Sequence, residues 1–538
     1  MPNKQLTVGD LIETNEIYDN NINEWNLLVT VFEGIRSIVN AGYITRHERE
    51  PMISYRRRME ELFGFGYTKS VVEIFHFFLF KKEPLSKLGG LLEDKLWQLF
   101  DKDSNLYGMD YNTTIMDIAL WAAVQGHMGI LVDKANAHFK TKEQQIREKV
   151  YPYIAKYHPQ SILDWMWSRD TYNRPFLSYL KLEDEGSQYR IWTPDNWEIW
   201  ELPKDKNGQI LKSDISANGV FIDEGVNPLG EIPFLWFYNQ RSKKIALGKS
   251  DVHEVSRIDL SIIRNMSQSE EIINYAAFPM MRKPLRDARP TDLNAPQQED
   301  EVSVQSVLEF DPENPESKPD WLEAQVSEPI TSILEFVEKK ISEIYRAANI
   351  GGMTATEPTK YSQSGIAKKV DFQLLNSKMI AKATNLEDAE NKILEYWCRW
   401  EGVWEKYKNT AKMARAKSYD IEDLTAALDD ALTAKTVVFS RTFDSLLQKQ
   451  TARLVLPAAT EQQMAEIDKE IDVAIQAERK IEEFGIDNPS MNKEDREIID
   501  IGIKTIPKGE VIAQDKSKII DGVDVTTLGE EDFKKYAN

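Results

Sequence analysis

Two segments in the middle of the chain place apolar residues at helical spacing, and a proline-rich, acidic stretch separates them. In the first, from Asp251 to Ala277, the spaced residues are Val255, Ile258, Ile262, Met266 and Ile273. In the second, from Glu328 to Asn349, they form one stripe of Ile330, Ile333, Leu334, Val337, Ile341, Ile344, Tyr345 and Ala348. At 1.5 Å per residue, each helix would be roughly 30–40 Å long. The pattern predicts two long amphipathic helices that carry the intervening stretch at their far end.

The intervening stretch cannot continue either helix. It has prolines at positions 284, 290, 296, 312, 315 and 319, and proline fixes φ and has no N–H to donate. Short strands such as Val302–Phe310 are the structure that it can form. Between residues 285 and 328 it has twelve acidic side chains against Arg286, Arg289 and Lys318. A solvated loop and a surface that the two helices present to a partner both fit this composition.

The N-terminal half mixes helical and strand patterns. Helical spacing is found at residues 20–41, 51–62, 69–80, 91–100 and 111–126. The apolar run Gly129–Val132 predicts a buried strand that ends at Asp133. From Ser161 to Tyr238 the pattern favours strands, at residues 189–192, 197–202, 219–223 and 232–238. The expected fold class is therefore α+β and helix-rich.

Beyond the second long helix, Gly351–Pro358 is a loop of small residues, and residues 365–407 follow without a proline. Apolar groups recur there every three or four residues up to Trp404, which predicts one helix of roughly 60 Å. Thr436–Phe439 is a candidate strand, and the pattern at Thr460–Phe484 predicts an acidic helix. The polar tail from Asn488 onward is expected to be weakly ordered at its end.

Composition limits the classes of protein that fit. A length of 538 residues exceeds a single core, so two or more units are expected, and 41% hydrophobic residues with 13 Trp exclude wholesale disorder. The net charge of −21 argues against tight wrapping of nucleic acid, but it is compatible with a protein that lets DNA pass. The single cysteine, Cys398, excludes an internal disulfide. Because neither a membrane-spanning apolar run nor a signal-peptide pattern at Met1–Asp10 is found, a soluble, cytoplasmic product is expected.

Signals for catalysis are weak. Gly248-Lys249-Ser250 has the end of a phosphate-binding loop, but Lys243 replaces the required earlier glycine; a turn with Ser250 or Asp251 as the N-cap of the next helix is expected. The six histidines show no zinc-binding spacing, and His76 and Cys398 are interpreted as core residues. Asp133 is the one well-placed carboxylate at a strand end, and one carboxylate does not make a two-metal site. We expect no enzymatic activity, no cofactor and no metal.

Two basic clusters have alternative explanations. Arg56-Arg57-Arg58 has the composition of a nucleic-acid patch, but Glu60 and Glu61 follow it, so a salt-bridged helix face is favoured. Lys360, Lys368 and Lys369 lie near the glycine loop of an otherwise acidic chain. A DNA contact and a solvated surface fit these lysines equally well.

In the order and spacing of its segments, the chain resembles the portal proteins of tailed bacteriophages over most of its length. Phrases that look like the family are Tyr55–Arg58 before Phe63–Phe80, Phe80–Pro84, Gly126–Asp133, Asn227–Phe237, Arg257–Asn265 and Ser364-Gly365. No single phrase is diagnostic. The resemblance implies a portal fold with an α/β wing (1–250), a first stem helix (251–281), a clip (282–327), a second stem helix (328–350), a tunnel loop (351–363), a long wing helix (364–410), a wing return with a strand (411–447), crown helices (448–500) and a tail (501–538).

The same resemblance implies a function. Portal proteins form a homo-oligomeric ring, of about twelve copies, at one vertex of the capsid and away from any membrane. Such a ring nucleates head assembly with the major capsid protein and scaffold, and it docks the large terminase and later the head–tail adaptor. Double-stranded DNA passes along its axis during packaging and ejection. The protein would be found in the virion and, during assembly, in the host cytoplasm.

Carried onto this chain, the resemblance assigns three groups of residues. The constriction around DNA would be Gly351–Gln363, with Gly351 and Gly352 as hinges, Lys360 as a transient phosphate contact, and Thr354, Thr356 and Lys368 beside them. Intersubunit bridges or channel lining would come from Lys339, Lys340 and Arg346. Clip docking would use Arg282, Lys283, Arg286, Arg289 and Trp321.

Two other classes remain as alternatives. One is another ring of the head–tail connector, or a scaffold, although adaptors are usually far shorter. The other is a packaging nuclease or ATPase, which the missing phosphate loop, histidine pair and carboxylate cluster disfavour.

Overall fold

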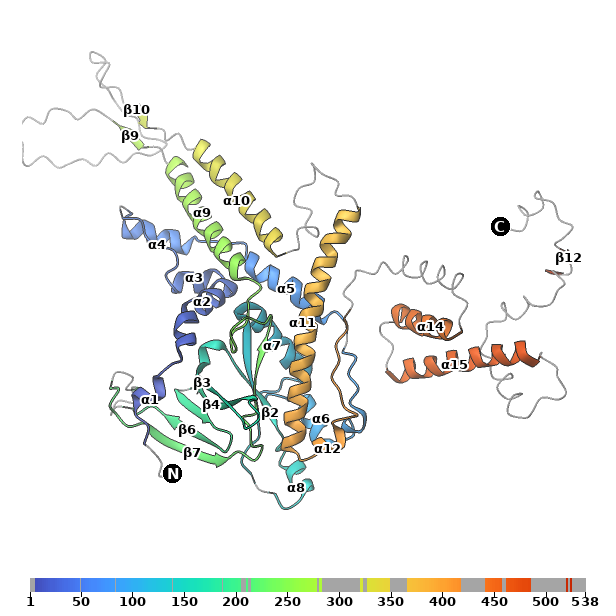
Figure 1. Cartoon of the computed structure of the whole chain (residues 1–538). Coiled ribbons are helices and arrows are strands. Elements are labelled where there is room, and N and C mark those ends of the chain that lie inside the picture. The colour runs from blue at the N-terminus through green and yellow to red at the C-terminus, as the bar shows by residue number, and fades with distance from the viewer. Residues whose placement is uncertain are drawn as a thin grey trace, which may run out of the picture. The chain divides into compact units, whose positions relative to one another are not determined.

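The chain forms two compact units, residues 1–419 and 420–538 (Figure 1). The structure is a computed structural model, and it describes residues 5–48, 50–82, 84–137, 139–185, 187–204, 210, 214–277, 280–282, 320–322, 327–348, 365–417, 441–456, 461–484, 519–520 and 523–524. Mixed helices and antiparallel sheets confirm the helix-rich α+β class. No helix in these ranges combines the length and the apolar character needed to cross a membrane.

The helices of the first unit are α1 (Val8–Ile12), α2 (Glu16–Glu33), α3 (Ile35–Asn40), α4 (Met52–Glu60), α5 (Tyr67–Phe80), α6 (Lys95–Lys102), α7 (Tyr111–Gln125), α8 (Lys142–Arg147), α9 (His253–Ala277), α10 (Ser327–Ala347), α11 (Gly365–Trp400) and α12 (Trp404–Tyr407), with 3-10 turns at Gly89–Leu91 and Pro159–Ser161. Its strands are β1 (His127–Asp133), β2 (Tyr153–Tyr157), β3 (Ile162–Arg169), β4 (Pro175–Asp184), β5 (Gln188–Trp192), β6 (Asn196–Glu201), β7 (Val220–Val226), β8 (Phe234–Tyr238), β9 (Met280–Arg282) and β10 (Asp320–Leu322).

Two antiparallel sheets form the body of this unit. In the smaller sheet, β1 lies between β2 and β8, and every residue of β1 is buried, as its continuous apolar run predicted. The larger sheet is a meander in the order β3-β4-β5-β6-β7, so β3 and β7 are its two edges. The strands predicted at residues 189–192, 197–202, 219–223 and 232–238 are confirmed as β5, β6, β7 and β8.

The long helix α11 packs against β1 and β8 and closes the main core (Figure 1). Trp397 of α11 is fully buried, with its ring 5.0 Å from that of Trp97 in α6 and 6.0 Å from that of Phe100. Such aromatic contacts contribute stability beyond the area that they bury.

Glycines end two helices earlier than the periodicity predicted. The expected helix at residues 20–41 is divided into α2 and α3 at Gly34, whose φ of +100° is outside the helical range. The expected helix to residue 407 stops at Trp400, because Gly402 adopts φ +67° and the next N–H, of Val403, returns to the carbonyl of Cys398 (2.9 Å). This pair of features is a Schellman cap.

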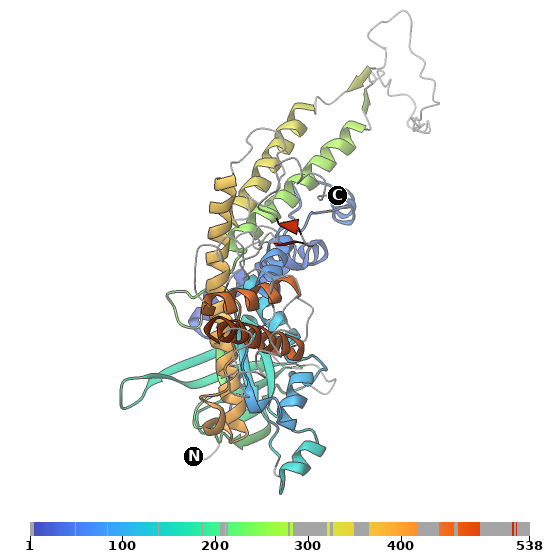
Figure 2. The ribbon, with the colours of Figure 1, turned by 90° about the vertical axis from the view of Figure 1, so that its right-hand side faces the viewer.

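Helices α9 and α10 run side by side away from the body, and β9 pairs with β10 at their outer end (Figures 1 and 2). Both predicted long helices are confirmed to within two residues at each end. The first stem helix is shorter than the predicted range 251–281, because Met280 and Met281 belong to β9 and pair with Leu322 and Trp321. The predicted strand Val302–Phe310 lies outside the described residues.

The second unit contains α14 (Arg441–Val455), α15 (Glu461–Phe484) and the short strands β11 (Ile519–Ile520) and β12 (Val523–Asp524). Helices α14 and α15 are joined by ion pairs from Lys449 to Asp472 (2.6 Å) and from Arg453 to Asp468 (2.8 Å), whose order shows an antiparallel pair. The predicted acidic helix is confirmed as α15. The predicted strand Thr436–Phe439 lies outside the described residues.

Candidate functional site

The candidate site is the stem, which we define as α9, α10, β9 and β10. Its inner face is apolar: Val255 and Ile262 of α9 and Val337 and Ile344 of α10 are buried together against α5. Beside this buried stripe, Leu334 and Phe336 of α10 are 43% and 55% exposed, and because they are two residues apart they lie on opposite flanks of the helix. An amphipathic helix normally buries its apolar residues, so these exposed side chains leave part of the α10 surface uncovered by the residues that the structure describes.

The three basic residues predicted on the second stem helix have different environments. Lys340 donates to Ser261 Oγ of α9 (2.7 Å) and lies 4.3 Å from the centre of the Phe336 ring. Burial lowers the pKa of Lys340. Arg346 is exposed and pairs with Glu343 of the same helix (2.6 Å), and Lys339 is exposed. Lys340 therefore joins the two stem helices inside one chain, while Lys339 and Arg346 face solvent.

The root of α9 is held by a buried carboxylate between two lysines of α11. The side chain of Asp251 is fully buried; it forms an ion pair with Lys382 and lies 3.4 Å from the ammonium group of Lys378. Burial alone would raise the pKa of Asp251, but Lys382 and then Lys378 outweigh it and hold that pKa below its usual value. Lys382 also donates to Asn239 Oδ1. Asp251 thus fixes the stem to the long helix, and the prediction that it caps α9 is wrong.

The Gly248–Ser250 segment is an irregular connection to α9, in which Gly248 forms an isolated antiparallel bridge with Arg241. A Cβ atom on Gly248 would lie 1.9 Å from the carbonyl oxygen of Gly126, so only glycine permits this approach to the end of α7. Ser250 Oγ donates to the carbonyl of Val124 (2.5 Å) and accepts from the N–H of Val252 (3.0 Å). Ser250 therefore orders the connection before α9, but since α9 begins at His253, neither Ser250 nor Asp251 is at the N-cap position expected for one of them.

Further along α9, two buried polar contacts attach the stem to α4 and α5. Asp259 accepts from the backbone N–H and the hydroxyl of Thr68, both at 2.8 Å. Arg58 is buried; it pairs with Glu50 (2.7 Å) and donates to Ser267 Oγ (3.1 Å). The predicted salt-bridged helix face is confirmed for Arg57, which lies 4.0 Å from Glu61, whereas Arg58 instead pairs with Glu50 in the interior.

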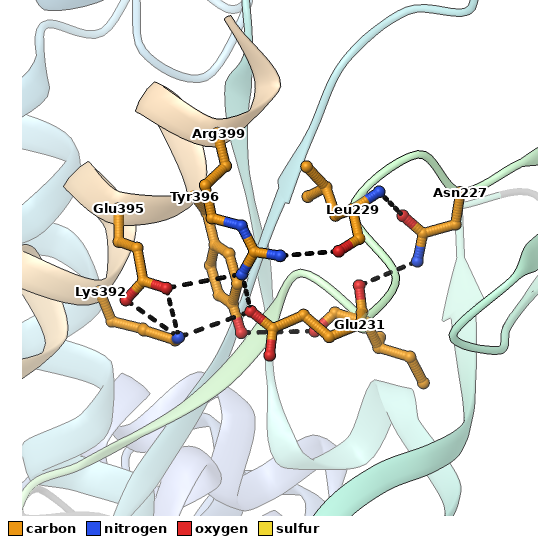
Figure 3. A network of polar contacts seen from close by, with 8 residues as sticks. Asn227, Leu229, Glu231, Lys392, Glu395, Tyr396 and Arg399 are labelled. Atoms are coloured by element: carbon orange, nitrogen blue, oxygen red, sulfur yellow. Dashed lines mark hydrogen bonds and ion pairs between the residues drawn. The ribbon is translucent and has the colours of Figure 1, made fainter. Parts of the chain in front are cut away.

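A polar network fixes the opposite end of α11 to the loop between β7 and β8 (Figure 3). Arg399 forms an ion pair with Glu231 and donates to the carbonyl of Leu229 (2.7 Å). Asn227 closes the loop on itself, since its side chain donates to the carbonyl of Glu231 (2.9 Å) and accepts from the N–H of Leu229 (3.1 Å). Lys392 adds a contact to Glu231 at 3.6 Å. The sequence phrase at Asn227–Phe237 therefore has a structural role, which its residue pattern alone did not reveal.

The remaining predicted residues fall into two groups. Gly351, Gly352, Thr354, Thr356 and Lys360, and the clip residues Lys283, Arg286 and Arg289, lie outside the described residues. Lys368 is in α11, Arg282 is in β9, and Trp321 is in β10. Arg282 and Trp321 are brought to one place, because they lie on the two paired strands at the outer end of the stem.

Residues that were weighed for catalysis have structural partners. Asp133 is buried and contacts Arg190 (2.5 Å) and Tyr153 (3.1 Å). His76 Nε2 is 3.0 Å from the carbonyl oxygen of Met116. Cys398 is fully buried, and burial raises the pKa of its thiol to about 12. Within the described ranges, no cluster of three or more His, Cys, Asp or Glu side chains has the arrangement of a metal site.

Known proteins show only a distant structural similarity to this chain. No protein-family model and no curated protein matches the chain. Among solved structures, it is similar to a chain of "Neck of empty GTA particle computed with C6 symmetry", with a TM-score of 0.38 and 10% identity, over 74% of this chain and 94% of that chain. A TM-score this low assigns neither a family nor a function.

Proposed function

We propose that this chain is a portal subunit of a tailed bacteriophage, which forms a ring at one capsid vertex and lets DNA pass along its axis. The observation that carries the proposal is the stem, in which two helices of 25 and 21 residues are rooted in an α/β body and bear a strand pair at their outer end. The order of the segments in the sequence supports the same assignment. In this proposal the acidic insertion docks the large terminase and then the head–tail adaptor, and the chain itself is not an enzyme.

Ring formation has a physical basis in the stem. A ring needs a heterologous contact, in which one surface of a copy meets a different surface of the next. Leu334 and Phe336 are two residues apart, about 200° around the helix, so they supply exposed apolar area on opposite flanks of the buried stripe of α10, one flank for each neighbouring copy. Removal of this apolar area from water would stabilise stems that stand side by side.

The role of the stem is tested by a charge at Leu334, on one exposed flank of α10. We expect Leu334→Glu to shift the purified chain from rings to monomers in sedimentation velocity, because a carboxylate would be buried between copies without a partner. Tyr107→Glu is the matched control: Tyr107 is 85% exposed in a loop of the body, and the same change of charge there should leave assembly intact. Equal assembly of wild type and Leu334→Glu would contradict the role of α10 in the ring.

The role of the predicted tunnel loop has a separate test. Deletion of residues 351–363 should leave the ring formed but should abolish packaging or retention of DNA in assembled heads. Normal DNA content in particles that carry the deletion would show that the constriction lies elsewhere.

A further inference from the structure

The turn between β3 and β4 projects from the larger sheet, and Figure 2 shows this hairpin extending beyond the rest of the body. Residues 166–176 are exposed throughout. Among them are large apolar side chains, namely Met166 (54% exposed), Trp167 (40%), Tyr172 (77%) and Phe176 (37%). Large apolar side chains gathered at the tip of a projecting hairpin indicate a docking surface. We call these residues the hairpin tip.

The charge of the hairpin tip is positive. Arg169 and Arg174 are exposed, and Arg174 lies over the Tyr172 ring (5.4 Å to its centre). The one carboxylate, of Asp170, accepts the backbone N–H groups of Tyr172 (2.9 Å) and Arg174 (2.8 Å) and so orders the turn. Two guanidinium groups are therefore held at fixed places beside the apolar side chains.

The opposite edge of the same sheet, strand β7, is also apolar but carries the opposite charge. Strand β7 pairs only with β6, so one side of its backbone is free of a strand partner among the described residues. Its side chains Val220 (45%), Phe221 (41%), Ile222 (46%) and Val226 (77%) are exposed, beside the exposed carboxylates of Asp223 and Glu224. Neither carboxylate takes part in an ion pair within the described part of the chain. We call β7 the acidic edge.

We infer that the hairpin tip of one copy docks on the acidic edge of the next copy. The occupant of each surface is a second copy of this chain, because the two surfaces match in apolar character and are opposite in charge. A long apolar edge strand is an aggregation hazard unless something covers it, and docking would supply that cover. The inference rests on the proposed ring and adds to it a second contact, in the body rather than in the stem.

The position of the two surfaces also fits a closed assembly. They lie on different parts of one sheet, so a copy that offers its hairpin tip still has its acidic edge available for another copy. Such a contact is heterologous and propagates from copy to copy until a ring closes. An isologous contact of either surface with itself would bring like charges together and is disfavoured.

Charge reversal with rescue tests the pairing. Arg174→Glu should weaken association between copies by about tenfold or more in sedimentation velocity, because it places like charges together. Arg174→Glu combined with Glu224→Arg should restore association. Arg147→Glu in α8, where the arginine is also exposed, is the control and should have no effect. The inference is wrong if Arg174→Glu behaves like this control, or if the second change gives no rescue.

Cysteine cross-linking separates this inference from the proposed function. Cys398 is buried, so added cysteines react alone. A Thr171→Cys, Ile222→Cys double variant should give a ladder of cross-linked oligomers, each single variant should give none, and a mixture of the two single variants should stop at dimers. Rings in electron micrographs without a ladder would overturn the contact and leave the ring proposal standing. Dimers from Thr171→Cys alone would show an isologous contact and overturn the inference. A wild-type chain that stays monomeric would overturn both.

Discussion

The junction between α9 and α11 gives the sharpest prediction about stability. Asp251 is fully buried and faces two lysines, of which Lys382 is 4% exposed and Lys378 is 19% exposed. Asp251→Asn keeps the shape of the side chain but removes the negative charge that pairs with both lysines. Loss of one partner of a buried ion pair costs about 3–5 kcal/mol. We therefore expect Asp251→Asn to lower the free energy of unfolding by that amount at neutral pH.

Replacement of the lysine partner should lower the unfolding free energy by less. Lys382→Met leaves Asp251 paired with Lys378 at 3.4 Å, and the methionine can still pack on Phe75. The unfolding free energy should then fall by about 1–3 kcal/mol, the amount expected when buried acceptors lose a hydrogen-bond donor. Lys392→Met is the control on the same helix: Lys392 is 36% exposed, and its ion pairs are of the surface kind that contributes about 0–1 kcal/mol.

The dependence on pH follows from the pKa of Asp251. Because that pKa is lowered in the folded chain, the stabilisation is complete above the ordinary pKa of an aspartate, about 4, and is lost as the pH falls below it. The difference between wild type and Asp251→Asn should therefore be constant from about pH 5 to pH 8 and should shrink in stronger acid.

Urea unfolding followed by tryptophan fluorescence is a suitable assay. All 13 tryptophans lie at or before Trp404, so the signal reports only on residues 1–419. The free energies come from linear extrapolation, at two protein concentrations, so that an effect of assembly is recognised. The proposed role of the buried junction is wrong if the unfolding free energy of Asp251→Asn is within about 1 kcal/mol of the wild-type value. It is also wrong if Lys382→Met lowers the unfolding free energy more than Asp251→Asn does.

Three further predictions concern single residues. Gly248→Ala should cost at least about 2 kcal/mol of unfolding free energy, because its Cβ would overlap the Gly126 carbonyl, whereas Gly90→Ala, with no atom nearer than 3.9 Å, should change little; equal effects would contradict the close approach. Burial lowers the pKa of His127 to about 3, so below about pH 6.5 the unfolded chain binds one more proton than the folded chain, and the free energy of unfolding decreases as the pH is lowered. In urea titrations, His127→Phe should reduce the decrease in unfolding free energy between pH 7 and pH 5 by about 2 kcal/mol; the same decrease in wild type and variant would refute this. Cys398 should react with a thiol reagent in urea at least about a hundredfold faster than in the native chain, since burial raises its pKa to about 12; rapid native labelling would show an accessible thiol.

Long periodic segments and buried apolar runs were predictable from the sequence. The two stem helices, β1 and α15 each carry a pattern that a single structure satisfies. The helix ends at Gly34 and Gly402 were missed because apolar spacing continues across them, although both glycines were visible as stop signals. The spacing of apolar residues does not reveal a change of backbone direction at a single residue.

The candidate site was predictable only in outline. Asp251 and Lys382 are 131 residues apart, and nothing in either local pattern indicates that they meet. Lys340 was predicted to bridge subunits or line the channel, but its contact with Ser261 within one chain depends on how α10 lies against α9. The acidic edge depends on strand order, because β7 is exposed only as the last strand of the meander. Such features come from tertiary packing.

The most direct test of the portal proposal is the mass and shape of the purified chain, by native mass spectrometry together with negative-stain electron microscopy. The proposal predicts a closed ring of about a dozen copies with an axial hole, and a mass that is the corresponding multiple of 62.1 kDa. A compact monomer would contradict it, the more so if that monomer cleaves DNA or hydrolyses ATP.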